Sequence, residues 1–183
     1  MDIPFDVTRI KLETARLQLR PFEATDLEDF YTYASVPEVG ECAGWPHHES
    51  IKASSKILNE IIEKKVAVAI YHKTDKKVIG SISLNRSWTN RNDTYKHLKA
   101  KEIGFVLSKN YWGQGIMPEA VNTLVHYGFS ELGLEAIALA HFGENTRSKR
   151  VAEKCGFIYI ETGRFYAKLL NKQYDDVRYI LTK

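Results

Sequence analysis

The sequence has few cysteines and no long apolar run. Cys42 and Cys155 lie far apart and form no Cys-x-x-Cys or Cys/His spacing, so neither a disulfide framework nor a zinc site is predicted. No stretch approaches the roughly 18 to 20 uninterrupted apolar residues that a transmembrane helix needs. The acidic start, residues 1–7, lacks the basic region and apolar core of a signal peptide. We therefore expect a cytoplasmic protein with no membrane partner and no metal.

An excess of charge of one sign is also lacking, because 26 Lys and Arg residues stand against 23 Asp and Glu residues, a net charge of +3. So small a charge does not predict nucleic-acid binding, although it suits a phosphate-bearing ligand. The composition, 44% hydrophobic and 27% charged, is that of an ordinary globular protein. No repeat or linker divides the chain. We predict one domain over residues 1–183, with a core from about 12 to 180.

Hydrophobic periodicity predicts an α/β chain in which strands and helices are interspersed. The predicted strands are residues 12–21, 66–71, 78–84, 102–107, 136–142, 157–161 and 174–181. The predicted helices are about residues 26–34, 51–62, 117–132 and 146–154. Thr25 and Glu28 suggest a capping box for the first helix, and Asn145 and Gly156 suggest the two caps of the last.

Residues 102–120, EIGFVLSKNYWGQGIMPEA, predict a strand, a glycine turn and a helix in succession. Gly113 and Gly115 allow the turn to close on a ligand. Pro118 fits the first turn of the helix, because the N–H groups there have no partner within the helix and proline has no N–H to leave unpaired. A helix N-terminus carries roughly half a positive charge and free N–H donors. The segment is therefore predicted to cradle an anion such as a pyrophosphate.

Two familiar phosphate-binding loops do not fit this spacing. A dinucleotide-binding Gly-x-Gly-x-x-Gly that starts at Gly113 would need glycine where Pro118 stands, and the chain has no Gly-x-x-x-x-Gly-Lys-Ser/Thr. Nicotinamide and nucleoside-triphosphate ligands are therefore not predicted. Taken alone, Gly113 and Gly115 fit an ordinary tight turn as well as a ligand site.

The cradle resembles the acetyl-CoA-binding motif of GNAT N-acetyltransferases, Gln/Arg-x-x-Gly-x-Gly/Ala. Residues 110–115 match this motif except that Asn110 stands in place of Gln or Arg. Trp112 before the first glycine, and the Glu-Ala pair in the helix, are similar to the RimJ/RimL-like branch, which includes ribosomal-protein N-terminal acetyltransferases. Residues 145–157 resemble that branch's Asn-x-x-Ser … Lys-x-Gly-Phe signature. The resemblance covers about residues 12–180.

The resemblance implies a fold and a cosubstrate. The implied fold is α/β (α+β), with a central mixed, mostly antiparallel sheet of about six to seven strands and about four flanking helices. Its fourth and fifth strands splay apart, and the pantetheine arm of acetyl-CoA lies between them like an added strand. Homodimers are frequent among such proteins. The implied partners are acetyl-CoA and an amine acceptor.

The implied cofactor contacts fall in three places. Val106 and Leu107 would pair with the pantetheine arm through strand backbone. Asn145 would contact the same arm, and its side chain also fits a helix N-cap. The pyrophosphate would lie on the N–H groups of Trp112, Gly113, Gln114, Gly115, Ile116 and Met117.

Glu102 matches a position where many GNAT enzymes carry a general-base glutamate, acting directly or through water. An alkylamine with a pKa near about 10 must lose a proton before it attacks a thioester, which is why a base is needed. The alternative role for Glu102 is a solvated strand-end charge or an ion-pair partner of Lys101.

Ala152 stands where many relatives carry a tyrosine acid. Ser148 is the residue that the RimL-like signature offers instead, near the sulfur, where its hydroxyl would hydrogen-bond or protonate the thiolate. Its alternative role is a first-turn hydroxyl bonded to the helix backbone. The missing tyrosine supports a second hypothesis, in which the chain is a catalytically weak acyl-CoA-binding module.

The acceptor is expected to be a protein N-terminal α-amine or a small amine such as a polyamine, an aminoglycoside or an amino acid. Trp45, Trp88 and Tyr95 lie in irregular segments and either line an acceptor pocket or pack under loops. His47 and His48 have no companion carboxylate at metal-ligand spacing, so no metal site is predicted there.

Overall fold

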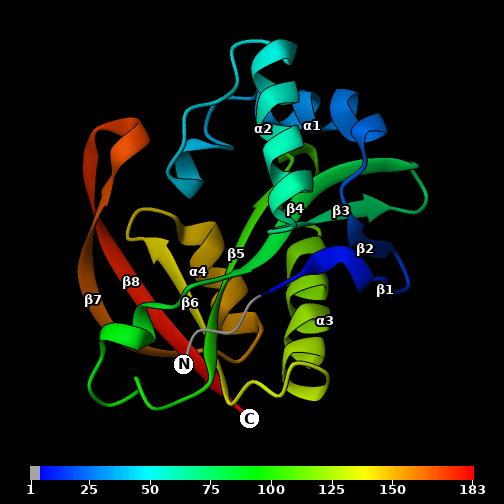
Figure 1. Cartoon of the computed structure of the whole chain (residues 1–183). Helices are drawn as coiled ribbons and strands as arrows, with labels where there is room; N and C mark the ends of the chain where they lie inside the picture. Colours follow the sequence, from blue (N-terminus) through cyan, green and yellow to red (C-terminus); the bar gives the residue numbers. More distant parts are fainter. Residues whose placement is uncertain (1–4) are drawn as a thin grey trace.

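The computed structural model describes residues 5–183, which form one eight-stranded sheet with helices on both faces (Figure 1). The helices are α1 (Leu27–Ala34), α2 (Ile51–Lys64), α3 (Ile116–Ser130) and α4 (Thr146–Lys154). The strands are β1 (Leu12–Glu13), β2 (Leu17–Pro21), β3 (Val68–His72), β4 (Lys77–Asn85), β5 (Ala100–Leu107), β6 (Ala136–Phe142), β7 (Ile158–Ala167) and β8 (Lys172–Thr182). No helix in this described range is long and apolar enough to cross a membrane.

The sheet is mixed and mostly antiparallel, in the order β1-β2-β3-β4-β5-β6-β8-β7. Its one parallel pair in residues 5–183 is β5 with β6, which runs from Ala100 opposite Ala136 to Ile103 opposite Leu139. Beyond Ile103 the second half of β5 has no partner on that side, so the sheet opens there. This confirms the predicted splay. The fourth and fifth predicted strands are β5 and β6 here, because the first predicted strand, residues 12–21, is divided into β1 and β2.

The first strand differs from its prediction. The sequence predicts one strand over residues 12–21, but β1 and β2 form a hairpin with Leu12 opposite Leu19. The chain reverses at Thr14, whose N–H donates to the Leu17 carbonyl at 3.0 Å. No Gly, Pro or Asn marks this turn, so the pattern does not reveal it. The sheet therefore has eight strands instead of six to seven.

The predicted capping box of Thr25 and Glu28 does not form; α1 has no side-chain N-cap, and a capping box instead closes the 3-10 turn Ala24–Asp26 that precedes it. The Asp26 carboxylate accepts the N–H of Glu23 at 2.8 Å, at a short 3-10 turn that precedes the helix. Arg20 donates to the same carboxylate at 2.7 and 2.8 Å. Because Arg20 comes from β2, the cap depends on how the strand and the helix pack together.

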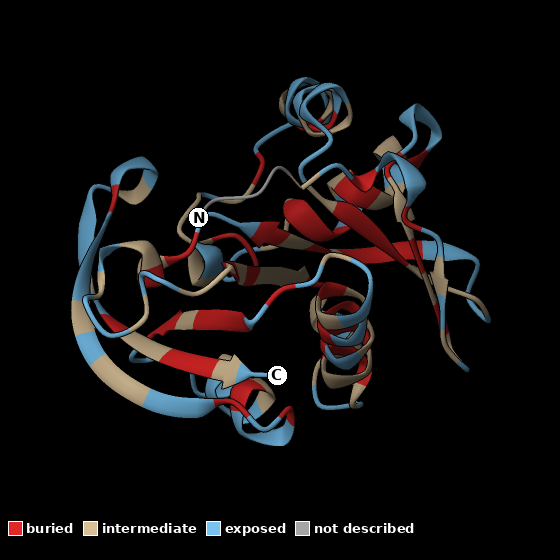
Figure 2. Cartoon of the chain, turned by 60° about the horizontal axis from the view of Figure 1, so that its bottom comes forward, coloured by how far each residue is buried: buried red, intermediate tan, exposed pale blue. Residues whose placement is uncertain are grey.

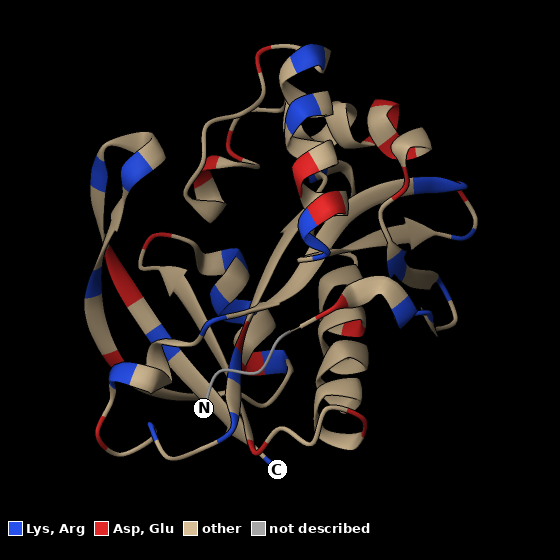
Figure 3. Ribbon diagram, viewed as in Figure 1, with Lys and Arg blue, Asp and Glu red and all other residues tan. Residues whose placement is uncertain are grey.

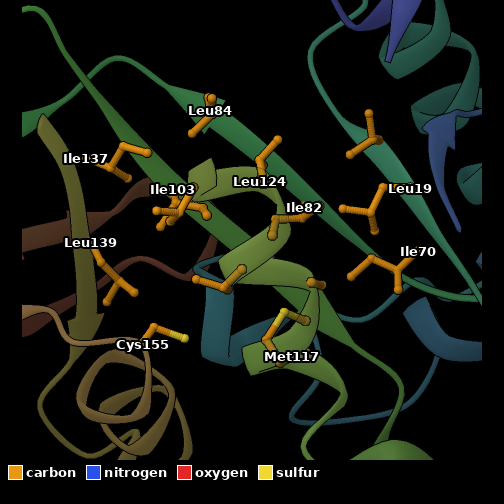
Figure 4. Close-up of a cluster of buried hydrophobic side chains, with 14 of the residues drawn as sticks. Leu19, Ile70, Ile82, Leu84, Ile103, Met117, Leu124, Ile137, Leu139 and Cys155 are labelled. Carbon is orange, nitrogen blue, oxygen red and sulfur yellow. The ribbon is translucent and has the colours of Figure 1, made fainter. Parts of the chain in front are cut away.

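Two hydrophobic cores lie on opposite faces of the sheet. The larger one lies between α3, α4 and the sheet, and Figure 4 shows Leu124 of α3 among the strand residues, Ile103 included. The smaller one lies under α1 and α2, with Leu58 and Val78 among its members. Each fully buried Leu or Ile contributes about 1.5–3 kcal/mol, so the two cores anchor the helices against the sheet.

The caps of α4 agree with the prediction. The Asn145 side chain accepts the N–H of Ser148 at 3.1 Å, as an N-cap does. Gly156 follows the helix with φ of +78°, the left-handed conformation that glycine adopts at low cost. The helix start is thus held beside the end of β6.

The hairpin of β7 and β8 is longer than predicted and forms the exposed edge of the sheet (Figure 2). Residues 162–167 of β7 were not predicted as strand, because most of them face solvent and show no apolar alternation. At the tip, Asn171 has φ of +48° and Leu169 is 73% exposed.

Candidate functional site

A cavity of about 220 Å³ lies where the glycine turn, the second half of β5 and the start of α4 meet. Nine predicted cofactor residues line it: Val106, Leu107, Trp112, Gly113, Gly115, Ile116, Met117, Asn145 and Ser148. Gln114 belongs to the same turn but does not line the cavity, and Glu102 lies further back along β5. The fold therefore brings the two sequence motifs to one cavity.

The turn before α3 presents free backbone donors. Gly113 and Gly115 have φ of +77° and +74°, so both require the conformation that glycine allows. Within residues 5–183, no acceptor bonds the N–H groups from Gly113 to Met117, and the next position, Pro118, has none. The N–H of Trp112, expected among the donors, instead bonds the Lys109 carbonyl at 3.1 Å. The cradle is therefore one residue shorter than predicted.

Arg16 holds the cradle in place, a role that sequence reasoning missed. Its guanidinium donates to the Gln114 carbonyl at 3.0 Å and to the Glu119 carboxylate at 2.7 Å. Thr14 also bonds Glu119. Arg16 sits at a solvent-facing position of an alternating pattern, so only the packing of the β1–β2 turn on α3 reveals this contact.

Trp112 is fixed beside the cavity by its side chain. Its indole N–H donates to the Leu107 carbonyl at 2.8 Å, and the Arg147 guanidinium lies 3.9 Å from its ring centroid. Arg147, Arg150 and Lys154 line the cavity from α4, where Lys and Arg outnumber acidic residues (Figure 3). Positive charge beside free N–H groups favours a ligand with several phosphates. No sequence argument had selected these three cations.

The backbone of β5 facing the splay belongs to Phe105 and Leu107. Hydrogen-bonded pairs alternate along an antiparallel ladder, and the Ser108 N–H bonds the Ile79 carbonyl at 2.8 Å. Val106 therefore pairs with Ser81 of β4 instead of offering its backbone to the splay as expected. Because the Leu107 carbonyl is bound to Trp112, the free groups are both those of Phe105 and the N–H of Leu107.

Asn145 has contacts compatible with both of its expected roles. It is 8% exposed, caps α4 through its oxygen, and directs its amide nitrogen to the Cys42 carbonyl at 3.5 Å. The amide thereby joins α4 to the 3-10 turn Glu41–Ala43, which forms another wall of the cavity.

Replacement of Asn145 by Ala is expected to cost about 1 kcal/mol of stability through the lost cap, and to weaken binding of acetyl-CoA as well. Ser50→Ala is the matched control, because Ser50 caps α2 by the same bond, to the N–H of Ala53 at 3.2 Å, away from this cavity. Thermal unfolding and titration calorimetry separate the two effects. If Asn145→Ala and Ser50→Ala lose the same stability and both bind acetyl-CoA with wild-type affinity, Asn145 acts only as a helix cap.

Ser148 lines the cavity from the first turn of α4. Its N–H is used by the cap, whereas its hydroxyl makes no hydrogen bond with any other residue in the described range. The alternative role, a hydroxyl bonded to the helix backbone, is therefore not seen. Ala152, where a tyrosine acid was missing, is fully buried in the larger core.

Glu102 is half-buried, in contrast to the alternative of a solvated strand-end charge. Its carboxylate accepts the Trp88 N–H at 3.0 Å, and the charges of Asp176 and Arg178 act on it with opposite signs. Burial raises the pKa of Glu102 to about 7, a value suited to a base at neutral pH. Glu102 and Val106 share a sheet face about 13 Å apart, at roughly 3.3 Å per residue.

The other aromatic and histidine candidates have separate places. Trp88 and Tyr95 pack edge to face at 6.1 Å between ring centroids, beside Glu102. His47 bonds Glu41 at 2.8 Å, and His48 bonds Ser54 at 2.7 Å. No group of three or more metal-binding side chains gathers in the part of the chain that the structure describes.

Comparison with known proteins identifies the family to which the sequence is similar. The sequence matches the family model described as an acetyltransferase (GNAT) domain over residues 16–158. The uncharacterized N-acetyltransferase YoaA of Bacillus subtilis (strain 168) is 30% identical over 177 residues, which cover 94% of this chain and 96% of that protein.

One further relative is a ribosomal-protein acetyltransferase, and one solved structure of similar fold contains acetyl-CoA. The ribosomal-protein-serine acetyltransferase of Escherichia coli (strain K12) is 34% identical over 101 residues, 55% of this chain and 52% of that protein. The crystal structure of the microcin C7 self-immunity acetyltransferase MccE, in complex with acetyl-CoA and AMP, has a TM-score of 0.75 at 22% identity and covers 93% of this chain and 94% of that one.

Proposed function

We propose that this chain, which belongs to the family of GNAT acetyltransferase domains, moves an acetyl group from acetyl-CoA to a primary amine. Membership of that family makes it an acyltransferase. The observation that carries the proposal is a single cavity in which a glycine cradle, unpaired strand backbone and a basic helix meet. Acetyl-CoA has a pyrophosphate, an amide-bearing arm and a further phosphate to match these three surfaces.

The chain's own groups supply the binding contacts. The free N–H groups from Gly113 to Met117 hold the pyrophosphate, as helix N-termini hold anions elsewhere. The free backbone of Phe105 and Leu107 pairs with the amides of the arm like an added strand. Arg150 and Lys154 contribute positive charge at the open end of the cavity.

Three groups act on the reaction itself. Acetyl-CoA supplies an activated thioester carbonyl. Glu102 takes the proton that the attacking amine must lose, directly or through a water molecule, and its raised pKa suits that task. Ser148 donates a hydrogen bond to the departing sulfur. The C–N bond forms as the C–S bond breaks, and one proton passes from the amine to the sulfur.

Two acceptor classes remain compatible with this chemistry. A protein N-terminal α-amine is supported by the ribosomal-protein-serine acetyltransferase relative, which matches 55% of this chain. A small amine fits the same reaction. The competing hypothesis, a weak acyl-CoA-binding module, rests on Ala152 alone.

Release of thiol from acetyl-CoA, measured across a panel of amines, tests the function. We expect release that depends on both the enzyme and the amine, together with an N-acetylated product of the expected mass. Calorimetry with acetyl-CoA alone provides the control. Binding without thiol release from any amine would contradict the transferase and leave the binding module.

A further inference from the structure

A second cavity, of about 600 Å³, lies on the opposite side of Val106 from the cofactor cavity. Its lining comes from α1, the loop of residues 45–50, α2 and the sheet, and Leu169 lines it from the tip of the β7–β8 hairpin. Figure 1 shows α1, α2 and this hairpin tip on the same side of the sheet. Val106 lines both cavities. Any ligand on the floor of the second cavity therefore lies next to the cofactor site.

The wall between the two cavities is rigidly packed. Val39, Cys42 and Ala43 line the cofactor cavity, whereas Trp45 lines the second one. A Cβ atom on Gly40 would come within 2.2 Å of the Trp45 ring, so the indole lies directly on the Gly40 backbone. The Trp45 ring also lies 5.1 Å from that of His48, which in turn lies 5.4 Å from Phe30. These rings form a preformed aromatic wall.

The lining is apolar and almost uncharged. Ala53, Ile57 and Ile61 of α2 complete the aromatic wall, and Glu49 is the one carboxylate among the lining residues. No Lys or Arg lines this cavity. Burial lowers the pKa of His48, which stays neutral at pH 7. Such walls favour a ligand with an uncharged body and a single ammonium group, since an unpaired charge in an apolar site is costly.

One polar group on the cavity floor has no well-aligned partner. Tyr33 is 2% exposed and lines the cavity, and its hydroxyl makes no hydrogen bond of regular geometry within the described residues, although the Ser81 side chain is near enough to offset part of the pKa rise that burial causes. Burial raises the pKa of Tyr33 far above its usual value, so the group stays an O–H donor. Ser81 is the strand partner of Val106, which places this donor near the junction of the cavities. A buried donor without a partner is costly unless a ligand satisfies it.

We propose that the second cavity binds the acceptor, and that the acceptor is a small primary amine with a neutral aromatic or branched apolar body and an uncharged oxygen beside the amine. This inference rests on the proposed acetyl transfer. The amine end extends past Val106 along β5 toward Glu102, so that water carries its proton to that carboxylate, while the oxygen accepts the hydrogen bond of Tyr33 and the apolar body packs on Trp45. A volume of about 600 Å³ lies within the range of roughly 300–1,000 Å³ typical of small-molecule sites.

The walls disfavour polyamines, aminoglycosides and free amino acids. A polyamine or an aminoglycoside carries several ammonium groups, for which one carboxylate is insufficient. A free amino acid carries a carboxylate, and the lining has no Lys or Arg to pair with it. An amide or ester of an aromatic amino acid has neither problem.

The test compares kcat/KM for five acceptors: phenylalaninamide, phenethylamine, phenylalanine, spermidine and a peptide with an N-terminal serine. We expect phenylalaninamide to exceed phenylalanine, spermidine and the peptide by about tenfold or more. Tyr33→Phe should lower kcat/KM for phenylalaninamide about five- to tenfold, as loss of one neutral hydrogen bond does, and leave phenethylamine, which has no oxygen, unchanged. Tyr127→Phe, on α3 and away from both cavities, is the matched control.

Stability provides a second readout. Because the Tyr33 hydroxyl makes no hydrogen bond of regular geometry in the free protein, Tyr33→Phe should leave the melting temperature unchanged or raise it. A lowered melting temperature with equal losses for phenylalaninamide and phenethylamine would overturn the role of Tyr33. Faster transfer to spermidine or to the peptide would overturn the acceptor class and leave acetyl transfer standing, whereas no thiol release from any amine would overturn both proposals.

Discussion

Gly113→Asp is expected to lower the affinity for acetyl-CoA by about a hundredfold or more. The new carboxylate would stand in the cradle, where Gly113, Gly115, Ile116 and Met117 line the cavity and their N–H groups have no acceptor within the described residues. Two like charges about 4 Å apart at an effective dielectric constant near 20 repel by about 4 kcal/mol, and each 1.4 kcal/mol corresponds to a tenfold change. Titration calorimetry with acetyl-CoA measures the loss.

Gly156→Asp is a closely matched control for this substitution. Gly113 and Gly156 have nearly the same φ, +77° and +78°, and a Cβ atom at either position meets nothing within 4 Å. Both variants therefore carry the same backbone strain, about 1–2 kcal/mol for a left-handed residue, but only one places a charge in the cavity. We expect similar melting temperatures for the two variants and wild-type affinity for Gly156→Asp.

Gly113→Asn separates charge from size, because asparagine has nearly the shape of aspartate without its charge. Its affinity should lie between those of the wild-type protein and Gly113→Asp. Unaltered affinity in a folded Gly113→Asp variant would show that the pyrophosphate binds elsewhere.

Glu102→Gln is expected to lower turnover by about a hundredfold or more while acetyl-CoA affinity stays nearly unchanged. Glutamine keeps the acceptor oxygen for the Trp88 N–H but cannot take a proton. In the wild-type protein the rate should rise as pH increases through about 7, since the base must be deprotonated and its pKa is raised to about 7. The variant should lose this rise. Its deficit should then shrink at high pH, where more of the amine is already neutral.

The same substitution should stabilise the protein above pH 7. The folded chain holds a proton on Glu102 up to about pH 7, whereas an unfolded glutamate loses it near 4.5. Between these values the folded state binds more protons, so the free energy of unfolding falls as pH rises through that window. The fall is up to about 3 kcal/mol, since each pKa unit corresponds to about 1.4 kcal/mol. Glu102→Gln removes this cost, and its melting temperature at pH 8 should exceed that of the wild-type protein.

Glu135→Gln is the control for both readouts. Its carboxylate also accepts a backbone N–H, that of Lys99 at 2.7 Å, but it lies on the surface away from both cavities. We expect wild-type turnover and no stabilisation at pH 8. Wild-type turnover in Glu102→Gln from pH 6 to 9 would mean that the amine loses its proton before it binds.

Features that depend on short stretches of chain followed from the local sequence. Strand β6 has the predicted bounds, 136–142, because a short apolar run with flanking polar residues has few other structures available. Asn145 and Gly156 cap α4 as predicted, since a cap involves residues within one turn of each other. The glycine spacing and the family resemblance likewise pointed to the cradle.

Contacts between distant parts of the chain depend on how the whole chain packs. The hold of Arg16 on the cradle and the burial of Glu102 beside Trp88 join residues far apart in sequence. The second cavity forms where α1, α2, the sheet and the hairpin tip meet, so no local pattern marks its wall. Local propensity acts over a few residues, whereas burial, and with it the pKa of Glu102 and the unpaired hydroxyl of Tyr33, depends on how all the elements pack together.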